Sequence, residues 1–431
     1  MPDYGDFYRA ERIAMFSINS DKNTISELRA EGHCLFKRAA RPLSIASRVW
    51  IASDLIKPPV WTAITIEGHG SINHLKFNNA LQIASAANPG SRLVLKGNLA
   101  WSHWVDSGKA PVLTEIEGSS WDGMTSQGVK PFLKTYDVRQ GPTAEVLIFY
   151  GEPTRIIFRA HHAVMDGRGL ITWIEDIFRV LNGRKPLGSD YTAIENDLLH
   201  LPDKTIHEPP VYNYISPVGK PAGNDTELVW KRISVQGQHT KLLASVLFLL
   251  AQASWRQGKG PVRFGIPVDL RHRRPGLRST GNLTNAIYIE IEPGFSVEKI
   301  AAEIQRRLRE KDDGKLNLED ILLPYVPISI LSWFLSADEQ SKFKNNNYRC
   351  TGFVTNLGKV DLKRFSCSGF SADSFFVLPV SISALPLFLT MSGYNDHTDY
   401  VLGMPKNFSS EGRMEEILDY IVNGLKDMTL S

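Results

Sequence analysis

The stretch RAHHAVMDGRGL, residues 159–170, places two adjacent histidines ahead of an aspartate and two glycines. Before it, the segment AEVLIFYGEPTRIIFRAHH has two apolar runs joined by Gly151-Glu152-Pro153, which predicts a β-hairpin. After it, apolar residues repeat at helical spacing until Asn182-Gly183 stops the helix. The histidines therefore lie at the carboxyl end of a predicted strand, followed by a tight loop and a helix.

Neighbouring residues of a strand point to opposite faces, so His161 and His162 are not expected to share one pocket. A histidine at a strand end is often a hydrogen-bonded core residue, and this interpretation stays open for either one alone. Histidine also accepts a proton near neutral pH, which makes one of the pair a candidate general base. A metal site would need the two histidines, or one of them and Asp166, to converge, and the following glycines break any helix that would align them. We expect no metal.

The composition favours two lobes and disfavours nucleic acid as a partner. The chain has 431 residues, 42% hydrophobic and 22% charged, which is more apolar material than one average domain buries. The net charge is only +3, and the basic residues are scattered. The densest basic cluster, Arg271-His272-Arg273-Arg274, fits either a phosphate contact or a solvated loop. The three cysteines, Cys34, Cys350 and Cys367, lack metal spacing and predict reduced thiols.

No targeting or membrane-spanning segment is expected. The chain begins MPDYGDFYRAERIAMF, with acids where a signal peptide would need a basic stretch and an apolar run. The longest apolar helix candidate, residues 242–251, is too short to span a bilayer. We therefore expect a cytoplasmic protein without a membrane span.

Predicted helices and strands alternate along the rest of the chain. Before the histidines we expect strands at 61–68, 91–97 and 103–107, and a helix over 72–87 whose apolar side carries Ile72, Leu75, Leu81 and Ile83. After residue 226 we expect helices near 239–256, 297–311, 318–343 and 411–426, and strands near 261–269, 285–292, 351–355, 374–378, 387–393 and 399–403. The predicted organisation is an N-terminal extension over 1–40, an N-terminal lobe over 41–185, a proline-rich crossover linker over 186–225 and a C-terminal lobe over 226–431.

HHAVMDG, residues 161–167, matches the signature HHxxxDG, and further landmarks follow in the same order. The quoted stretches are YDVRQGPTAEVLIFY at 136–150, GIPVDLRHRR at 265–274, GNLTN at 281–285 and TNLGKVD at 355–361. Over residues 41–431 the sequence resembles the superfamily that includes chloramphenicol acetyltransferase, the condensation domains of nonribosomal peptide synthetases, and standalone alcohol and polyketide-associated acyltransferases. The Asp-Phe-Gly-Trp-Gly stretch of plant BAHD acyltransferases has no counterpart here.

The resemblance implies an α/β (α+β) fold of two chloramphenicol-acetyltransferase-like lobes, each a mixed sheet flanked by helices, with a tunnel between them. One chain builds the whole tunnel, so a monomer is adequate. His162 would lie in the tunnel as the general base that takes the proton of an attacking hydroxyl or amine. His161 would be a supporting residue of the site.

Further site residues follow from the same landmarks. The resemblance implies that Asp166 pairs with Arg271 across the lobes and holds the motif loop, while Gly167 keeps that loop tight beside the acyl group. Either this role or that of a simple turn glycine would forbid a bulky side chain at Gly167. Thr355 and Asn356 occupy a tunnel landmark that usually reads Ser-Asn, with threonine in place of serine.

The implied reaction transfers an acyl group from a thioester directly to a small-molecule acceptor, giving an ester or an amide. The donor would be acyl-CoA or a phosphopantetheinyl carrier protein, so an acyl or peptidyl carrier protein is a candidate partner, and no permanently bound cofactor is implied. Three alternatives stay open: an inactive condensation-like binding or scaffolding protein, a glycerolipid-type acyltransferase that uses His161 and Asp166 as an His-x4-Asp pair, and epimerisation or cyclisation by a condensation relative.

Overall fold

The computed structural model describes residues 40–98, 101–130, 133–200, 213–237, 239–315, 320, 322–345, 348–380 and 385–430. The chain divides into two units, Met1–Ala39 and Ala40–Ser431, and the first of these lies outside the described residues. Cys34 and nearly all of the predicted extension over 1–40 therefore lie outside them as well.

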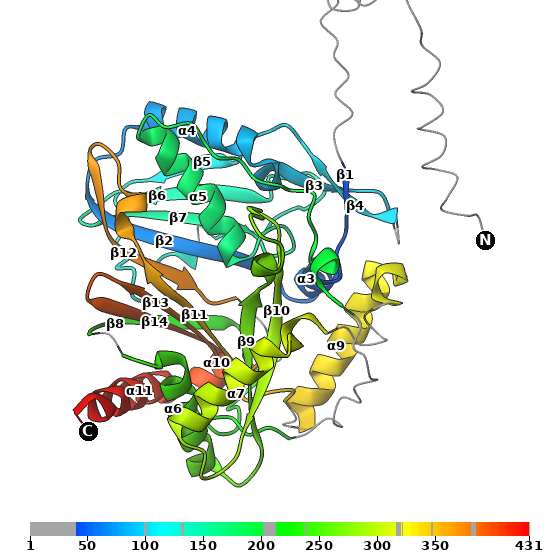
Figure 1. Ribbon diagram of the computed structural model, residues 1–431, viewed down its shortest axis with the longest axis vertical. Helices are drawn as coiled ribbons and strands as arrows, with labels where there is room; N and C mark the ends of the chain where they lie inside the picture. The colour runs from blue at the N-terminus through cyan, green and yellow to red at the C-terminus, as the bar shows by residue number, and fades with distance from the viewer. Residues whose placement is uncertain are drawn as a thin grey trace, which may run out of the picture. The chain divides into compact units, whose positions relative to one another are not determined.

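Two mixed sheets and a small third sheet make up this unit (Figure 1). The first sheet has the strand order β12 (Phe370–Leu378), β2 (Trp61–Gly70), β7 (Thr154–His161), β6 (Ala144–Phe149) and β5 (Val112–Ile116). The second has the order β10 (Thr284–Ile291), β9 (Val262–Asp269), β11 (Gly352–Val360), β13 (Phe388–Tyr394), β14 (His397–Pro405) and β8 (Leu228–Gln236). The third has the order β1 (Ala40–Pro42), β4 (His103–Asp106) and β3 (Leu93–Lys96).

Both large sheets mix parallel and antiparallel pairs. In the first sheet β5 and β6 are parallel and the other pairs antiparallel. In the second, β11 runs parallel to both β9 and β13. The helices are α3 (Ile45–Ile56), α4 (His74–Ala87), α5 (Gly167–Leu181), α6 (Leu242–Gln257), α7 (Val297–Arg309), α9 (Ile328–Asn345), α10 (Lys406–Ser409) and α11 (Arg413–Leu430). The expected α/β class with mixed sheets flanked by helices is confirmed.

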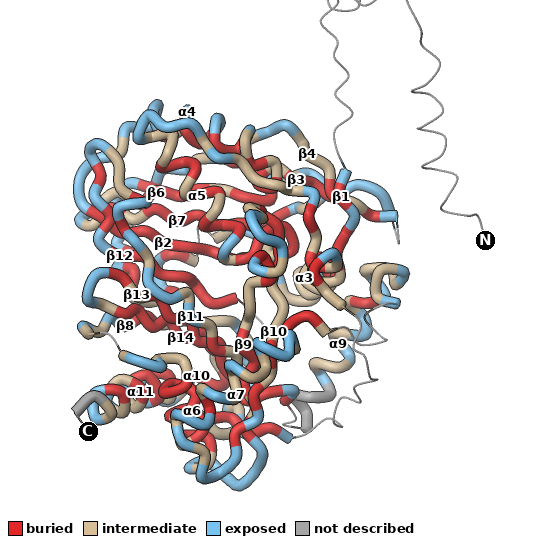
Figure 2. Tube along the Cα trace, in the orientation of Figure 1, coloured by how far each residue is buried: buried red, intermediate tan, exposed pale blue. Residues whose placement is uncertain are grey.

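Three apolar clusters hold the two large sheets and their helices together. One cluster joins α4 and α5 to the first sheet, and a second joins α6, α7 and α11 to the other large sheet (Figure 1). A third cluster takes Trp61 and Ile157 from the first sheet and Trp230 and Val401 from the second, so the two sheets pack against each other. Figure 2 shows the resulting band of buried positions along β2, β6 and β7.

A buried ionic cluster also links the two sheets. Arg232 of β8 donates to Glu67 of β2 at 2.6 Å and to Ser374 of β12 at 2.9 Å, and it contacts Asp399 of β14 at 2.8 Å. These side chains are all nearly inaccessible to solvent. Because an unpaired buried charge is costly, this cluster requires the sheets to meet in one register.

Several sequence predictions need correction. Strand β12 belongs to the predicted C-terminal lobe but pairs with β2 of the first sheet, from Phe370 opposite Gly70 to Leu378 opposite Ala63. A strand from beyond the predicted boundary at residue 226 therefore completes the sheet of the N-terminal lobe. The helix predicted over 318–343 is interrupted: residues 320 and 322 are helical, a 3-10 turn follows at Leu323–Tyr325, and α9 begins at Ile328 after Pro327, while residues 316–319 and 321 lie outside the described residues. Helix α3 and strands β1, β5 and β8 were not expected.

The apolar side predicted for the helix over 72–87 was right in part. Leu81 is buried in the core and Ile72, just before the helix, packs against it, whereas Leu75 and Ile83 are 78% and 41% exposed. Helix α4 buries Phe77, Leu81 and Ala84, which follow the i, i+4, i+7 spacing of one helical face. Phe77 and Ala84 were not among the predicted apolar positions.

No helix within the described ranges combines the length and the apolar character that a membrane crossing requires.

One prediction concerns the crowded glycine of α5. A Cβ on Gly169 would lie 2.4 Å from the carbonyl oxygen of Thr280, whereas a Cβ on Gly167 would have no protein atom within 4 Å. Since backbone atoms must move to admit it, Gly169→Ala is expected to lower the free energy of unfolding by roughly 1–3 kcal/mol. Gly167→Ala should be neutral or stabilising by up to about 1 kcal/mol, because alanine favours a helix over glycine. Urea unfolding of both variants measures this, and equal stabilities would contradict it.

Candidate active site

The two motif histidines lie in different environments. Along β7, Ile156 and Phe158 face α5, while Ile157 faces the second sheet. His161 continues the side of Ile157 and is fully buried. The strand ends at His161, and the backbone N–H of His162 donates to the carbonyl of Val60 at 3.1 Å. The side chains therefore diverge.

His161 has local partners and no access to the cavity described below. Its Nδ1 accepts a hydrogen bond from the backbone N–H of Ala163 at 3.0 Å. Since Nδ1 accepts, a ring hydrogen lies on Nε2, which is 3.6 Å from a carboxylate oxygen of Asp54. These contacts fit a buried residue that shapes the turn after β7.

His162 is half-buried and stacks on an indole from the unexpected helix α3. The ring centroids of Trp50 and His162 are 4.2 Å apart, with 7° between the planes. Ser44 caps α3 by accepting the backbone N–H of Ser47 at 3.1 Å. The half-buried face of α3 carries Trp50, while the adjacent face, with Ile51, packs into the core. A helix with two apolar faces lacks the amphipathic pattern by which helices are recognised in a sequence.

Burial lowers the pKa of His162 to about 4, against opposing contributions from the carbonyl groups of His162 and Met165 and from the carboxylate of Asp166. The ring is therefore neutral at pH 7 and able to accept a proton. A carbonyl oxygen only accepts hydrogen bonds, so the ring nitrogen that faces these carbonyls carries the hydrogen. The other nitrogen keeps a lone pair.

Asn282, from the GNLTN segment before β10, contacts the same histidine. Its Nδ2 donates to the carbonyl oxygen of His162 at 2.8 Å and lies 3.2 Å from Nδ1 of the ring. The second sheet thus reaches the histidine at the end of the first. Asn282 was within a quoted landmark, but its position gave no sign of this contact.

Asp166 makes five contacts that fasten the motif loop. Its carboxylate forms a bidentate pair with Arg271, with two N–O distances of 3.0 Å. It also accepts from the backbone N–H groups of Gly169 at 2.6 Å and Leu283 at 2.7 Å, and from the hydroxyl of Thr284 at 2.9 Å. Burial by itself would raise the pKa of Asp166, but Arg271 and these donors hold it below its usual value. The pair joins the N-terminus of α5 to the segment before β10.

The basic cluster at 271–274 is engaged within the protein. Arg271 is 9% exposed and also donates to Asp269 at 2.7 Å. Arg273 pairs with the buried Asp313 at 2.8 Å, and Arg274 pairs with Asp190. Arg271 and Arg273 are therefore not part of a solvated loop, and neither side chain is directed to a phosphate.

A cavity of about 460 Å³ opens beside His162. We call it the His162 cavity. One wall is the half-buried face of α3, another comes from β9, β10 and the segment between them, and α9 contributes a third. Its lining includes Trp50, His162, Asn282, Thr284, Glu195 and Cys350. Apolar walls with a few convergent polar groups are typical of small-molecule sites.

Not every predicted site residue reaches this cavity. Thr355 and Asn356 lie on β11 but are not among its lining residues, and Asn356 is exposed and accepts from the backbone N–H of Gly358 at 2.8 Å. A Cβ on Gly167 would meet no protein atom within 4 Å, so the protein leaves room for alanine there, and the expected exclusion of a bulky side chain stays a prediction. The close approach to the opposite backbone occurs at Gly169.

Two other chemistries find little support. Burial raises the pKa of the Cys350 thiol to about 12, so this cavity residue is a poor nucleophile at neutral pH. Cys350 and Cys367 are both free thiols. Within the described ranges, no group of three or more His, Cys, Asp or Glu side chains could hold a metal ion.

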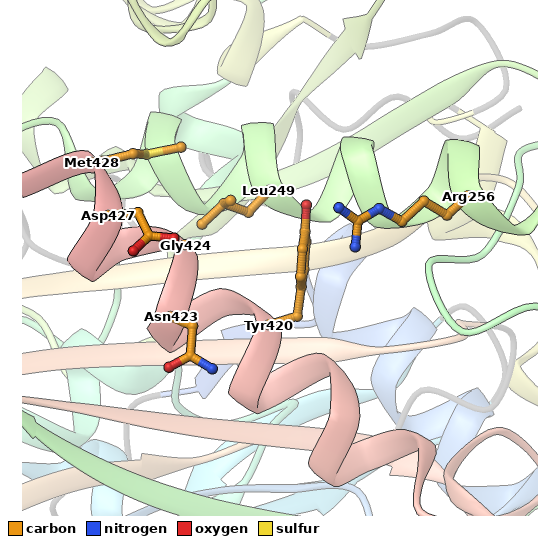
Figure 3. Close-up of a pocket in the computed structure, with 7 residues that line it drawn as sticks. All are labelled: Leu249, Arg256, Tyr420, Asn423, Gly424, Asp427 and Met428. Carbon is orange, nitrogen blue, oxygen red and sulfur yellow. The ribbon is translucent and has the colours of Figure 1, made fainter. Parts of the chain in front are cut away.

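A further cavity, of about 480 Å³, lies between α6 and α11 and contains none of the motif residues (Figure 3). The guanidinium of Arg256 lies 4.4 Å from the ring centroid of Tyr420, and Leu249 packs so closely on Gly424 that a Cβ there would come within 2.5 Å. This cavity marks a helix crossing.

Loss of Asp166 is expected to destabilise the fold. Asp166→Ala leaves Arg271 buried without its bidentate partner and removes the cap of α5, which should lower the free energy of unfolding by about 3–5 kcal/mol. The control is Glu415→Ala, which breaks the exposed 2.9 Å pair with Lys231, and a change of at most about 1 kcal/mol is expected there. Thermal unfolding of both variants checks this, and similar shifts in the two would contradict it.

No protein-family model matches the chain, and neither does any curated protein. Solved structures do match it. The condensation domain of the Monacolin K polyketide synthase MokA aligns with a TM-score of 0.59 at 11% identity, over 91% of this chain and 98% of its own. A variant of the starter condensation domain of rhizomide synthetase RzmA, in complex with C8-CoA and Leu-SNAC, aligns with a TM-score of 0.61 at 13% identity, over 90% and 94%.

The epimerization domain from the third module of tyrocidine synthetase B also aligns, with a TM-score of 0.59 at 10% identity, over 90% of this chain and 97% of its own. These alignments span nearly the whole of the second unit and of each neighbour. The chain therefore has the condensation-domain fold of two chloramphenicol-acetyltransferase-like lobes, which the HHxxxDG stretch and its landmarks predicted.

Proposed function

We propose that the protein is an acyltransferase that passes an acyl group from a thioester directly to a hydroxyl or amine acceptor. The observation that carries this proposal is the position of His162, stacked on Trp50 in the wall of a cavity, where burial lowers its pKa and keeps the imidazole neutral. A general base needs to be unprotonated and within reach of the substrate proton. His162 meets the first requirement through burial and the second through its place in the cavity wall.

In the proposed reaction, His162 accepts the proton of the acceptor as its oxygen or nitrogen attacks the thioester carbonyl. The tetrahedral intermediate then collapses, the carbon–sulfur bond breaks, and the leaving thiolate takes the proton back from the imidazolium. No covalent acyl-enzyme forms. General base catalysis typically contributes about 10²–10⁴-fold, so the alignment of two bound substrates must supply much of the remaining acceleration.

The acyl donor in this proposal is acyl-CoA or an acyl thioester on a carrier protein. The rhizomide synthetase neighbour was solved with C8-CoA and with Leu-SNAC. Another structural neighbour is a four-domain nonribosomal peptide synthetase, at a TM-score of 0.60 and 14% identity. These neighbours support a CoA or carrier-protein donor, a small-molecule acceptor and a place in secondary metabolism, with an acyl or peptidyl carrier protein as a partner.

The alternatives fit the geometry less well. A glycerolipid-type pair would couple His161 to Asp166, but the Nε2 of His161 faces Asp54, and Asp166 is engaged by Arg271. An inactive scaffold would not need an open cavity beside an intact second histidine. An epimerization domain shares this fold, so the fold does not exclude epimerisation. The acyl-transfer assay distinguishes the two reactions.

The first test measures thiol release from acyl-CoAs and acyl-pantetheine thioesters with pooled alcohol and amine acceptors. His162→Ala is expected to lower acceptor-dependent release by at least about 10²-fold, because the proton acceptor is lost. His74→Ala, at an accessible histidine on α4, is the matched control and should retain wild-type activity. Acceptor-dependent release that persists in the His162 variant would overturn the assignment of the base.

The pH profile provides a second test. Because burial lowers the pKa of His162 to about 4, the active neutral form persists well below the usual histidine range. With an alcohol acceptor, which does not titrate in this range, we expect kcat/KM to stay level as the pH falls from about 8 to about 5.5 and to decline only as it nears the lowered pKa. A half-maximal point near pH 6.5, the ordinary histidine value, would contradict a base held in a desolvated site.

A further inference from the structure

Glu195 is a buried carboxyl group in the wall of the His162 cavity, and one of its oxygens has no hydrogen-bond partner among the described residues. It opens the short helix η4 (Glu195–Leu198) and is 2% exposed. Its Oε1 accepts the backbone N–H of Ala46 at 2.5 Å. Its Oε2 is buried and has no hydrogen-bond partner among the described residues. Because a buried carboxylate oxygen without a partner is costly, this atom is suited to a donor group on a ligand.

The surroundings of Glu195 partly support a negative charge. The N–H of Ala46 belongs to the first turn of α3, where the helix dipole favours an anion. Burial raises the pKa of Glu195, and the nearby polar groups of Ser44 and Ala46 together with the charge of Arg41 oppose this rise only in part. No ion pair of Glu195 occurs within the described ranges. A cation at Oε2 would complete the compensation for burial.

Helix α3 sets the spacing between Glu195 and the proposed base. Ala46, which holds Glu195, and Trp50, which stacks on His162, are four residues apart on the same helical face. Four residues rise about 6 Å along a helix. Glu195 and His162 therefore both contact neighbouring turns of one helix that lines the cavity.

The charge of the cavity points in the same direction. Arg349 pairs with Asp338 at 3.2 Å, and Lys57 donates to the carbonyl of Thr226. The cavity is lined by four carboxylates and two cations, namely Glu195, Asp320, Asp338, Glu339, Lys57 and Arg349. This excess of carboxylates disfavours the phosphates of coenzyme A and favours a cationic ligand.

We propose that the His162 cavity is the acceptor site and that Glu195 binds an ammonium group of the acceptor, separate from the nucleophile that His162 deprotonates. The acceptor is then an amine-bearing alcohol or a diamine with an apolar body. The binding claim stands on the geometry of the cavity alone, and calling the ligand the acceptor rests on the proposed function.

The test compares two probes of matched shape, 4-phenylbutylamine and 4-phenylbutanol, by isothermal titration calorimetry near pH 7, where the amine is protonated. Wild-type protein is expected to bind the amine at least about tenfold more tightly than the alcohol. In Glu195→Gln the difference should vanish, because glutamine keeps an acceptor for Ala46 but loses the charge. Glu339→Gln, at another carboxylate of the same cavity, and Asp197→Asn, at an exposed carboxylate of η4, should keep it.

Equal affinities for the two probes in wild-type protein would overturn the proposal, whether or not the Glu195 variant folds. A tenfold preference that survives Glu195→Gln, or that disappears in Glu339→Gln instead, would overturn the assignment to Glu195. His162→Ala should keep the preference for the amine, since it leaves Glu195 in place. A failed acyl-transfer assay with an intact preference would therefore refute the proposed function and not the cation site, and the reverse result would refute only the cation site.

Discussion

The bidentate pair of Asp166 and Arg271 is the contact on which the arrangement of the site depends. A carboxylate and a guanidinium can be buried together only if they meet closely and their remaining hydrogen-bonding groups find partners. Here those partners are the first turn of α5 and the segment before β10. The end of a strand of the first sheet and the start of a strand of the second are thereby held at a fixed distance. His162 lies where they meet, and Asn282 reaches it from the second sheet.

Burial keeps the ring of His162 neutral and makes it a weaker base. The desolvated ring stays neutral at physiological pH, so it accepts a proton without first losing one. The same desolvation makes it a weaker base than free imidazole, since the imidazolium has little water to stabilise it. In the proposed reaction, catalysis would then depend on alignment, and the stack on Trp50 with the contact to Asn282 restrains the ring plane.

The fold alone does not select a reaction. The neighbours include domains described as condensation and epimerization domains, all at 10–14% identity. Specificity has to come from the residues around His162. In this chain those are the face of α3, the carboxyl group of Glu195 and the residues of α9 that close the third wall. Cys350 also lines the cavity, but burial raises the pKa of its thiol, so it stays protonated and is a poor nucleophile at neutral pH.

The sequence by itself determined the mixed α/β class, most helices and strands, and the strand, loop and helix that carry the HHxxxDG residues, because these depend on local periodicity and on glycine and proline positions. The pairing of Asp166 with Arg271 was accessible only through the resemblance, since 105 residues separate them. The tertiary structure alone decided the rest. Helix α3 has apolar residues on two faces, so its pattern concealed both the helix and Trp50. Strand β12 pairs with β2 of the first sheet, and no local sequence pattern indicates this pairing. Thr355 and Asn356 do not line the cavity, and Glu195 does, because membership of a cavity depends on contacts between distant segments that spacing along the chain does not encode.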